Sequence, residues 1–577
     1  VYHSIDSDIH DSFKAYQATR YVDNYIPHIP VVATGFDEMD NYVVSTTNWQ
    51  PYMWSINNVA FAETVHTAYS FWQSGRADEA FRMFKGAVLD AMYFGSGPGN
   101  ITQVSYYDAA RGEMYRDFAD PVAVGVRAIV QGMFGVLPDL MNDRVVIRPG
   151  FPSDWDHASL ETLNMKYEFK REENKDCYHI EPDLQKQGNL ILELEVPGQG
   201  VDYVKVNGEK IGFRVVEDCI GRPRIVVEAG KTKEYDVVVA WKNRKNDVER
   251  EILVEIARGD RLNVSLDDVV SLYDPQQVLE DAVLTQNGLE GVVRGLEGYR
   301  TLFVQRNKDG LSWWTPILVH IRQPLEIRNN SDVSALDFVL VNHTDKPIKG
   351  YLEVNGIPNV AHVDISAKGS QAFVCKAPIA SMGTNRIVVT TSEGAYTLKA
   401  INWNIRNSDG VRYEMVNMDA SFNDEVNNIF AYGKYRSPRW PYTTLCVPTQ
   451  GMGQWCHPND LSQIDDTGFR AMVKEGVYTL PQGIPFRTPS LKGQENVAFT
   501  TLWDNYPDSL SIALKGEASK AYLLVVASTY HMQSHFLNGT VTVRYKDGST
   551  DVLELILPEN LIPLDQDLFI DGAAFSS

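Results

Sequence analysis

Three clusters of carboxylates lie in segments without a regular apolar period. They are Asp6, Asp8 and Asp11 with His10; Asp37, Glu38 and Asp40; and Asp108, Glu113 and Asp117. Two carboxyl groups can divide the work of hydrolysis, because one donates a proton while the other activates water. Each cluster is therefore a candidate for acid–base chemistry.

Aromatic residues accompany the second and third clusters, and aromatic faces suit sugar rings. The catalytic candidates are Glu113, Glu38 and Asp37, and the substrate-binding candidates beside them are Trp49, Trp54, Tyr106 and Tyr107. The alternative is that these acids are ordinary loop or ion-paired residues. The first cluster resembles a metal site but lacks the Gly and terminal Glu of a calcium loop. We expect a solvated N-terminal turn there, and no metal.

Apolar residues recur at helical spacing between residue 1 and about residue 140. The three segments with this period are 52–75, 76–99 and 120–139, the last beginning with Asp120 as N-cap and Pro121 at the first helical position. Short connections predict antiparallel helical hairpins. Their faces carry little charge, and three helices cannot close such a layer. We therefore expect a missing N-terminal segment or a partner chain to complete it.

The pattern changes to period two at Arg144 and stays β-like to the end of the chain. Asn207-Gly208 and Asp547-Gly548 predict hairpin turns. The expected units are a helical part at 1–143 and β domains at 144–245, 246–325, 326–408 and 409–577. Tryptophans in these domains usually pack in cores, although Trp440 and Trp455 are also candidates for binding carbohydrate.

Composition and charge argue against several classes of partner and site. The net charge of -22 over 577 residues argues against nucleic acid, whose phosphates need a basic surface. No run of 18 apolar residues is present, so no membrane span is expected. Five scattered cysteines give neither a disulfide framework nor a zinc motif. The chain begins with Val and has no signal peptide, which indicates a processed or truncated product.

The stretches "GVLPD" (135–139) and "RVVIRPGFPSDW" (144–155) carry a family resemblance. The chain resembles the C-terminal half of six-hairpin (α/α)6 glycosidases, which include the α-rhamnosidase and α-fucosidase types. The resemblance implies a multidomain α + β fold: a partial toroid followed by several antiparallel β-sandwiches. It also places Glu113 in the loop before the last barrel helix, where relatives often have the catalytic base.

The stretches "PTQGMGQWCHP", "IDDTGFR" and "TLWDNYPD" resemble a family of gut-bacterial proteins from polysaccharide-degradation loci, which implies a periplasmic or extracellular location. The last block, with "LPQGIPFRTPS" and "VTVRYKDGS", resembles galactose-binding-like jelly rolls. The expected function is hydrolysis of a complex polysaccharide or oligosaccharide without a cofactor. The alternatives are a non-catalytic glycan-binding or scaffold protein and a polysaccharide lyase. A lyase would use Tyr, His and Arg, and the acidic charge balance counts against its anionic substrate.

Overall fold

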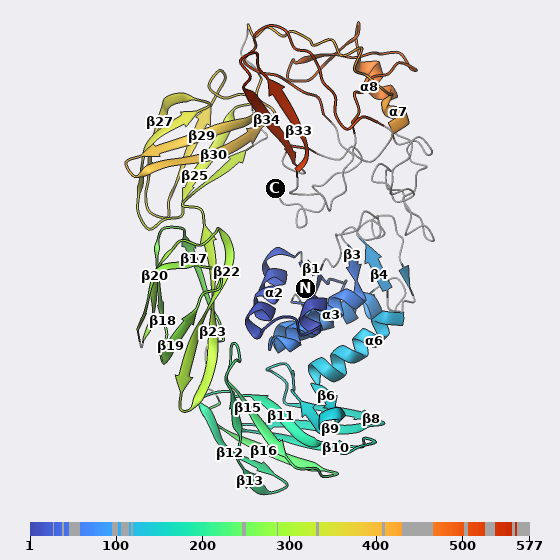
Figure 1. Cartoon of the computed structure of the whole chain (residues 1–577), viewed down its shortest axis with the longest axis vertical. Helices are drawn as coiled ribbons and strands as arrows, with labels where there is room; N and C mark the ends of the chain where they lie inside the picture. Colours follow the sequence, from blue (N-terminus) through green and yellow to red (C-terminus); the bar gives the residue numbers. More distant parts are fainter. Residues whose placement is uncertain are drawn as a thin grey trace.

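The structure is a computed structural model. It describes residues 1–26, 28–36, 38, 40–44, 58–94, 102–105, 115–116, 119–244, 250–285, 287–330, 334–406, 410–429, 466–500, 506–525, 537–556 and 560–561. Strands dominate it, and the longer helices gather in the first 140 residues. Figure 1 shows these helices near the centre, with successive β-sheets following an arc around them. No helix in the described ranges combines the length and apolar character needed to cross a membrane.

The helical part is built around an antiparallel hairpin of α3 and α4. Its elements are α1 (Tyr2–Asp6), α2 (Ser12–Tyr25), α3 (Phe61–Gln73), α4 (Ala77–Val88), π-helical η2 (Leu89–Phe94), and α6 (Ala119–Arg127) continuing as π-helical η3 (Ala128–Met133). Gly75 makes the hairpin turn with φ of +78°, a conformation that suits glycine. Asp78 and Glu79 lie in the first turn of α4, where they complement the helix dipole. The described helices do not show a toroid.

Short strands interrupt this region, which corrects the purely helical prediction. Residues 58–60 of the predicted helix form β3 (Asn58–Ala60) instead, which pairs with β4 (Thr102–Ser105), and β4 pairs with β5 (Tyr115–Arg116). Helix α3 begins at Phe61, and residues 52–57 lie outside the described residues. β1 (His28–Pro30) pairs with β2 (Tyr42–Val44). Helix α6 begins at Ala119, just before the predicted cap Asp120. Pairing between distant segments overrides local periodicity at these places.

The first β-sandwich follows η3 directly. One sheet has the order β13-β12-β16-β10-β9-β8 and the other β14-β15-β11-β7-β6. The bounds are β6 (Val136–Asp139), β7 (Arg144–Ile147), β8 (His157–Thr162), β9 (Met165–Glu172), β10 (Lys175–Pro182), β11 (Asn189–Glu195), β12 (Gly200–Val206), β13 (Glu209–Ile211), β14 (Arg214–Val216), β15 (Arg224–Ala229) and β16 (Tyr235–Lys242). Trp72 of α3 packs in one core with Tyr167 and Leu192, so the helices and this sandwich share a hydrophobic core.

Two further units follow the helical part (the first unit) and the first β-sandwich (the second unit). Each of the two consists of a pair of sheets with its own core. The third unit contains β17 (Ile252–Ala257), β18 (Arg261–Ser265), β19 (Val269–Tyr273), β20 (Leu279–Thr285), β21 (Gly288–Val293), β22 (Gly298–Lys308) and β23 (Leu311–Arg322). The fourth contains β24 (Leu325–Asn330), β25 (Leu336–Asn342), β26 (Ile348–Val354), β27 (Ile357–Ile365), β28 (Ser370–Cys375), β29 (Gly383–Thr391) and β30 (Gly394–Asn402). Most pairs are antiparallel, while β7–β11 and β17–β23 are parallel.

The last block is described only in part. It contains α7 (Val426–Ile429), α8 (Thr467–Met472), β31 (Val477–Thr479), β32 (Pro485–Arg487), β33 (Leu537–Arg544) and β34 (Thr550–Ile556). β33 and β34 form the hairpin predicted at Asp547-Gly548, and Gly548 has φ of +87°. The hairpin predicted at Asn207-Gly208 is also confirmed, between β12 and β13.

Helix α2 connects the helical part to the third unit. Tyr16 is buried in a small core with Phe303 and Leu318, against which Phe13 and Trp314 also pack. The helices therefore contact two β units.

Candidate functional site

Most of the predicted site residues lie outside the described residues: Asp37, Trp49, Trp54, Tyr106, Tyr107, Glu113, Trp440 and Trp455. Glu38 is described, and its side chain is 56% exposed. It forms an ion pair with Lys85 and accepts a hydrogen bond from Asn41 Nδ2 at 3.0 Å. These two partners lower the pKa of Glu38, so its carboxylate stays ionised at neutral pH. This is the ion-paired setting named above as the alternative to catalysis.

A polar cluster lies where α1, α3 and α6 meet, and we call it the α1–α3–α6 cluster. Its centre is Asp6, the last residue of α1, whose side chain is 15% exposed. Arg127 binds both oxygens of Asp6 in bidentate fashion, with two distances of 2.6 Å. His66 Nε2 lies 3.0 Å from Asp6 Oδ2, and Gln73 Nε2 lies 3.4 Å from Asp6 Oδ1. Both oxygens of Asp6 are therefore already occupied by partners.

The sequence of α3 explains why these groups face α1. Glu63, His66 and Gln73 are the positions of α3 that are only partly buried, while ten other side chains of the helix are buried. Their spacing of three and seven residues places them along one face. Apolar residues elsewhere on α3 thus orient this polar stripe toward α1 and α6.

Aromatic rings form a wall of the α1–α3–α6 cluster. The centroids of the Tyr2 and His66 rings are 4.7 Å apart, and those of His3 and His66 are 5.3 Å apart. The Arg127 guanidinium lies over the Tyr69 ring at 4.7 Å. His3 is exposed and the Arg127 side chain is 40% exposed, so the cluster is open to solvent on this side.

The charges within the cluster follow from burial and hydrogen bonding. Burial opposes ionisation of Asp6, but hydrogen bonds from Arg127 and His66 outweigh it and lower the pKa of Asp6. Burial lowers the pKa of His66 despite the nearby Asp6. At neutral pH we therefore expect ionised Asp6 beside neutral His66. An ionised carboxylate only accepts, so Nε2 of His66 carries the hydrogen and Nδ1 keeps a lone pair.

Glu63 is the second carboxylate of this region. It lies one helical turn before His66 on the same face of α3. Glu63 also acts on Tyr2. Burial and the negative charge of Glu63 together raise the pKa of Tyr2 to about 12. A carboxyl group and a neutral imidazole thus lie on the same face of α3, beside the aromatic wall.

The small β3–β4–β5 sheet links this region to the predicted loop. Ala60, just before α3, pairs with Gln103, and Gln103 pairs with Tyr115. Tyr115, two residues after Glu113, therefore lies two strands across the sheet from Ala60, the residue that precedes α3. Asp6 was expected to lie in a solvated turn, in a cluster that was one of three candidates for acid–base chemistry, whereas Glu63 and His66 were not among the predicted site residues. The signal that could have identified them is the polar stripe on an otherwise apolar helix.

Comparisons with known proteins give weak similarities. No protein-family model matches the chain, and no curated protein matches its sequence. Solved structures with similarity include an α-L-rhamnosidase from Dictyoglumus thermophilum, at 13% identity and a TM-score of 0.23 over 31% of this chain and 21% of the rhamnosidase. A β-glucuronidase from Parabacteroides merdae is 10% identical with a TM-score of 0.11, covering 26% of this chain and 23% of that enzyme.

Similarity also extends to immunoglobulin domains. Eight N-terminal immunoglobulin domains of Down syndrome cell adhesion molecule are 11% identical with a TM-score of 0.13, over 42% of this chain and 46% of that one. The chain spans about a fifth of the length of the rhamnosidase. The structural neighbours thus include glycoside hydrolases, but the likeness is low and local.

Proposed function

We propose that this protein is a glycoside hydrolase that cleaves a complex glycan, and that the α1–α3–α6 cluster forms part of its active site. One observation carries the proposal: Glu63 and the oriented imidazole of His66 share one partly open face of α3, beside the ring of Tyr2. Glycoside hydrolysis needs a proton donor, a group that activates water and a surface for the sugar ring. No cofactor enters this chemistry. We also propose a periplasmic or extracellular location, following the sequence resemblance.

Within this proposal the residues have distinct roles. Glu63 acts as one catalytic carboxyl, and Glu113, two residues before β5, stays our candidate for the opposing carboxyl. Asp6 is a positioning residue, because its oxygens are occupied by Arg127, His66 and Gln73 and have little capacity left for water. Its task is to hold the His66 ring with Nδ1 available to substrate.

A polysaccharide lyase is the second candidate, favoured by the presence of His66, Tyr2 and Arg127 in one cluster. A lyase needs a cation to neutralise the carboxylate of an anionic sugar. Arg127 already pairs with the Asp6 carboxylate through Nη1 and Nη2 and binds Gln131 through Nε at 2.7 Å, so three of its five N–H groups are engaged and Asp6 offsets its charge. The geometry therefore supports hydrolysis better than elimination.

The products of the reaction separate these functions. Purified chain is incubated with a panel of plant and host polysaccharides, and both new reducing ends and ultraviolet-absorbing unsaturated ends are measured. Hydrolysis gives reducing ends without unsaturated ends, elimination gives both, and a glycan-binding protein gives retention on a glycan column with neither. The variant Glu63→Gln should remove the reducing-end signal. Unsaturated products, or binding without cleavage, would contradict the proposal.

A further inference from the structure

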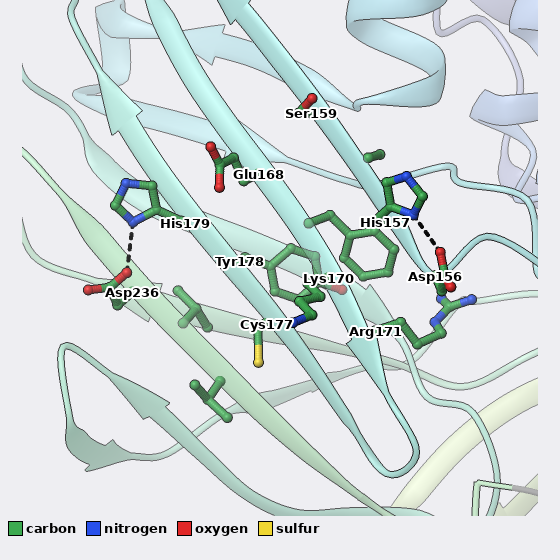
Figure 2. A pocket seen from close by; sticks show the side chains of 14 residues that line it. Asp156, His157, Ser159, Glu168, Lys170, Arg171, Cys177, Tyr178, His179 and Asp236 are labelled. Atoms are coloured by element: carbon green, nitrogen blue, oxygen red, sulfur yellow. Dashed lines mark hydrogen bonds and ion pairs between the residues drawn. The ribbon is translucent and has the colours of Figure 1, made fainter.

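The outer face of the first β-sandwich carries a group of metal-binding side chains unrelated to the α1–α3–α6 cluster. His179 on β10 lies directly opposite Asp236 on β16 in the antiparallel register. Figure 2 shows their side chains pointing toward one another across the two strands. His179 Nδ1 lies 2.7 Å from Asp236 Oδ1 and 3.8 Å from Glu234 Oε1, while Nε2 lies 3.0 Å from Glu181 Oε1.

Strand geometry explains why these groups meet. Residues two apart on a strand project from the same face, which places Glu181 beside His179 and Glu234 beside Asp236. The intervening residues Ile180 and Tyr235 are buried in the sandwich core, which fixes the register of both strands. The face that carries His179 is thus held outward by the core behind it.

The same face is hollowed. A shallow depression of about 620 Å³ extends across β8, β9, β10 and β16. Polar side chains that line it include Ser159, Glu168, His179 and Asp236. Glu168 on β9 lies opposite His179 in the register. The imidazole is therefore surrounded by carboxylates from three neighbouring strands, with room above them for an ion and its water ligands.

We propose that His179, Glu234 and Asp236 form a binding site for a divalent transition-metal ion such as zinc. The ligand atoms of these three residues all lie within 4.8 Å of one another. Bonds of about 2.0–2.2 Å from imidazole nitrogen and carboxylate oxygen allow one Zn²⁺ to touch all three after small side-chain adjustments. An imidazole with carboxylates suits zinc and related ions, whereas calcium prefers an all-oxygen shell of six to eight ligands. Among the described residues, this is the group whose geometry fits.

The charges around the imidazole favour a cation. Glu168, Glu181, Glu234 and Asp236 face His179, and Lys166 lies opposite Glu181 in the register. The four carboxylates outweigh the single lysine, and a divalent ion bound at the imidazole would offset part of their negative charge.

The test is calorimetric titration of the full chain with ZnCl₂ after chelation and removal of bound metals. We expect a 1:1 site that His179→Gln and Asp236→Asn each weaken by at least about tenfold, the loss that even an outer-shell change commonly causes. The matched control is His157→Gln. His157 pairs with Asp156 at 2.5 Å on the edge of the same depression, and within the described part of the chain no third ligand is grouped with it.

The side chains of His179 and Asp236 are 31% and 62% exposed, and circular dichroism of each variant checks that the sandwich remains folded. A visible absorption band from bound Co²⁺ that disappears in His179→Gln provides an independent readout. Three outcomes would overturn the site: no zinc binding, zinc binding that both variants retain, or an equal loss in His157→Gln. Preferential binding of Ca²⁺ over Zn²⁺ would overturn the assigned metal class.

Discussion

Tyr16 Oη donates a hydrogen bond to Glu251 Oε2 at 2.7 Å, although the two residues are 235 positions apart. Tyr16 lies in α2, and Glu251 immediately precedes β17. Asp23 of the same helix accepts from Arg76 Nη1 at 2.6 Å, and Arg76 leads into α4. Helix α2 is therefore tied to the third unit on one side and to the α3–α4 hairpin on the other. The α3–α4 hairpin held in this way also carries His66 and Gln73, which bind the carboxylate of Asp6 in α1.

Tyr16→Phe should destabilise this junction without disturbing its packing. Tyr16 is 4% exposed, so the variant leaves the Glu251 carboxylate without its buried phenolic donor. A hydrogen bond to a charged group contributes about 1.5–3 kcal/mol. Amide hydrogen exchange of α2 should accelerate correspondingly. Tyr21→Phe is the control, because Tyr21 is 51% exposed on the same helix, and equal acceleration in both variants would contradict the role of the hydrogen bond.

The turn of the α3–α4 hairpin gives a second prediction. Gly75 has φ of +78°, and a Cβ atom there would lie 2.3 Å from Arg224 Nη2 of the sandwich. Gly208 has a similar φ of +83° with nothing within 4 Å. Both alanine variants incur the left-handed cost of about 1–2 kcal/mol. Gly75→Ala must also move the Arg224 guanidinium, which is 11% exposed and ion-paired with Glu193 and Glu195. Chemical denaturation should show the larger loss for Gly75→Ala, and equal losses would show that the close approach is unimportant.

Acidification should weaken the α1–α3–α6 cluster through His66. Burial lowers the pKa of His66 below its usual 6.5, so the unfolded chain takes up a proton more readily than the folded one. The contribution of His66 to the free energy of unfolding therefore falls as pH decreases through about 6.5. Thermal unfolding of wild type and His66→Gln is measured at several pH values around this point. The wild type should lose more stability on acidification than the variant, and parallel curves would contradict the buried neutral state of His66.

Local signals in the sequence account for the β part of the fold. The turn at Asn207-Gly208 was predictable because both residues accept positive φ, here +50° and +83°, as a tight hairpin requires. Packing of Trp313 was expected as well, and its side chain is 1% exposed in the third unit. Alternation along β9 places Tyr167 and Phe169 inside and Lys166 and Glu168 outside, as period two demands.

The candidate site was less predictable, because it depends on contacts between distant segments. Asp6 was expected to be one acid of a solvated turn. Its carboxylate is instead bound by Arg127, 121 residues further along the chain, and by His66, 60 residues further along. No spacing rule connects these positions. The strand at Asn58–Ala60 was missed for the same reason, since its partner β4 lies more than 40 residues further along. Within α3 the partly exposed Glu63 and His66 were visible as polar residues on an apolar helix, but nothing local indicated what they face.

Asp6→Asn tests the positioning role within the proposed site. The change removes the negative charge that pairs with Arg127 and leaves one acceptor oxygen in place of two, so Arg127 and His66 can no longer both be bound as in the wild type. We expect a lower kcat with little change in KM, together with reduced thermal stability. Asp8→Asn is the matched control: Asp8 is exposed and has φ of +53°, which asparagine tolerates. Equal activity of Asp6→Asn and wild type would show that the cluster has no part in catalysis.

The catalytic role of the α1–α3–α6 cluster is tested by measuring kcat/KM of Glu63→Gln and His66→Gln on a glycan that the wild type cleaves, with product analysis for each. Removing general acid–base assistance costs about 10²–10⁴-fold. We predict a loss of this size for Glu63→Gln, with folded protein by circular dichroism and hydrolytic products from the residual activity. Full activity of Glu63→Gln, or unsaturated products that depend on His66 alone, would contradict the assignment of this cluster to glycoside hydrolysis.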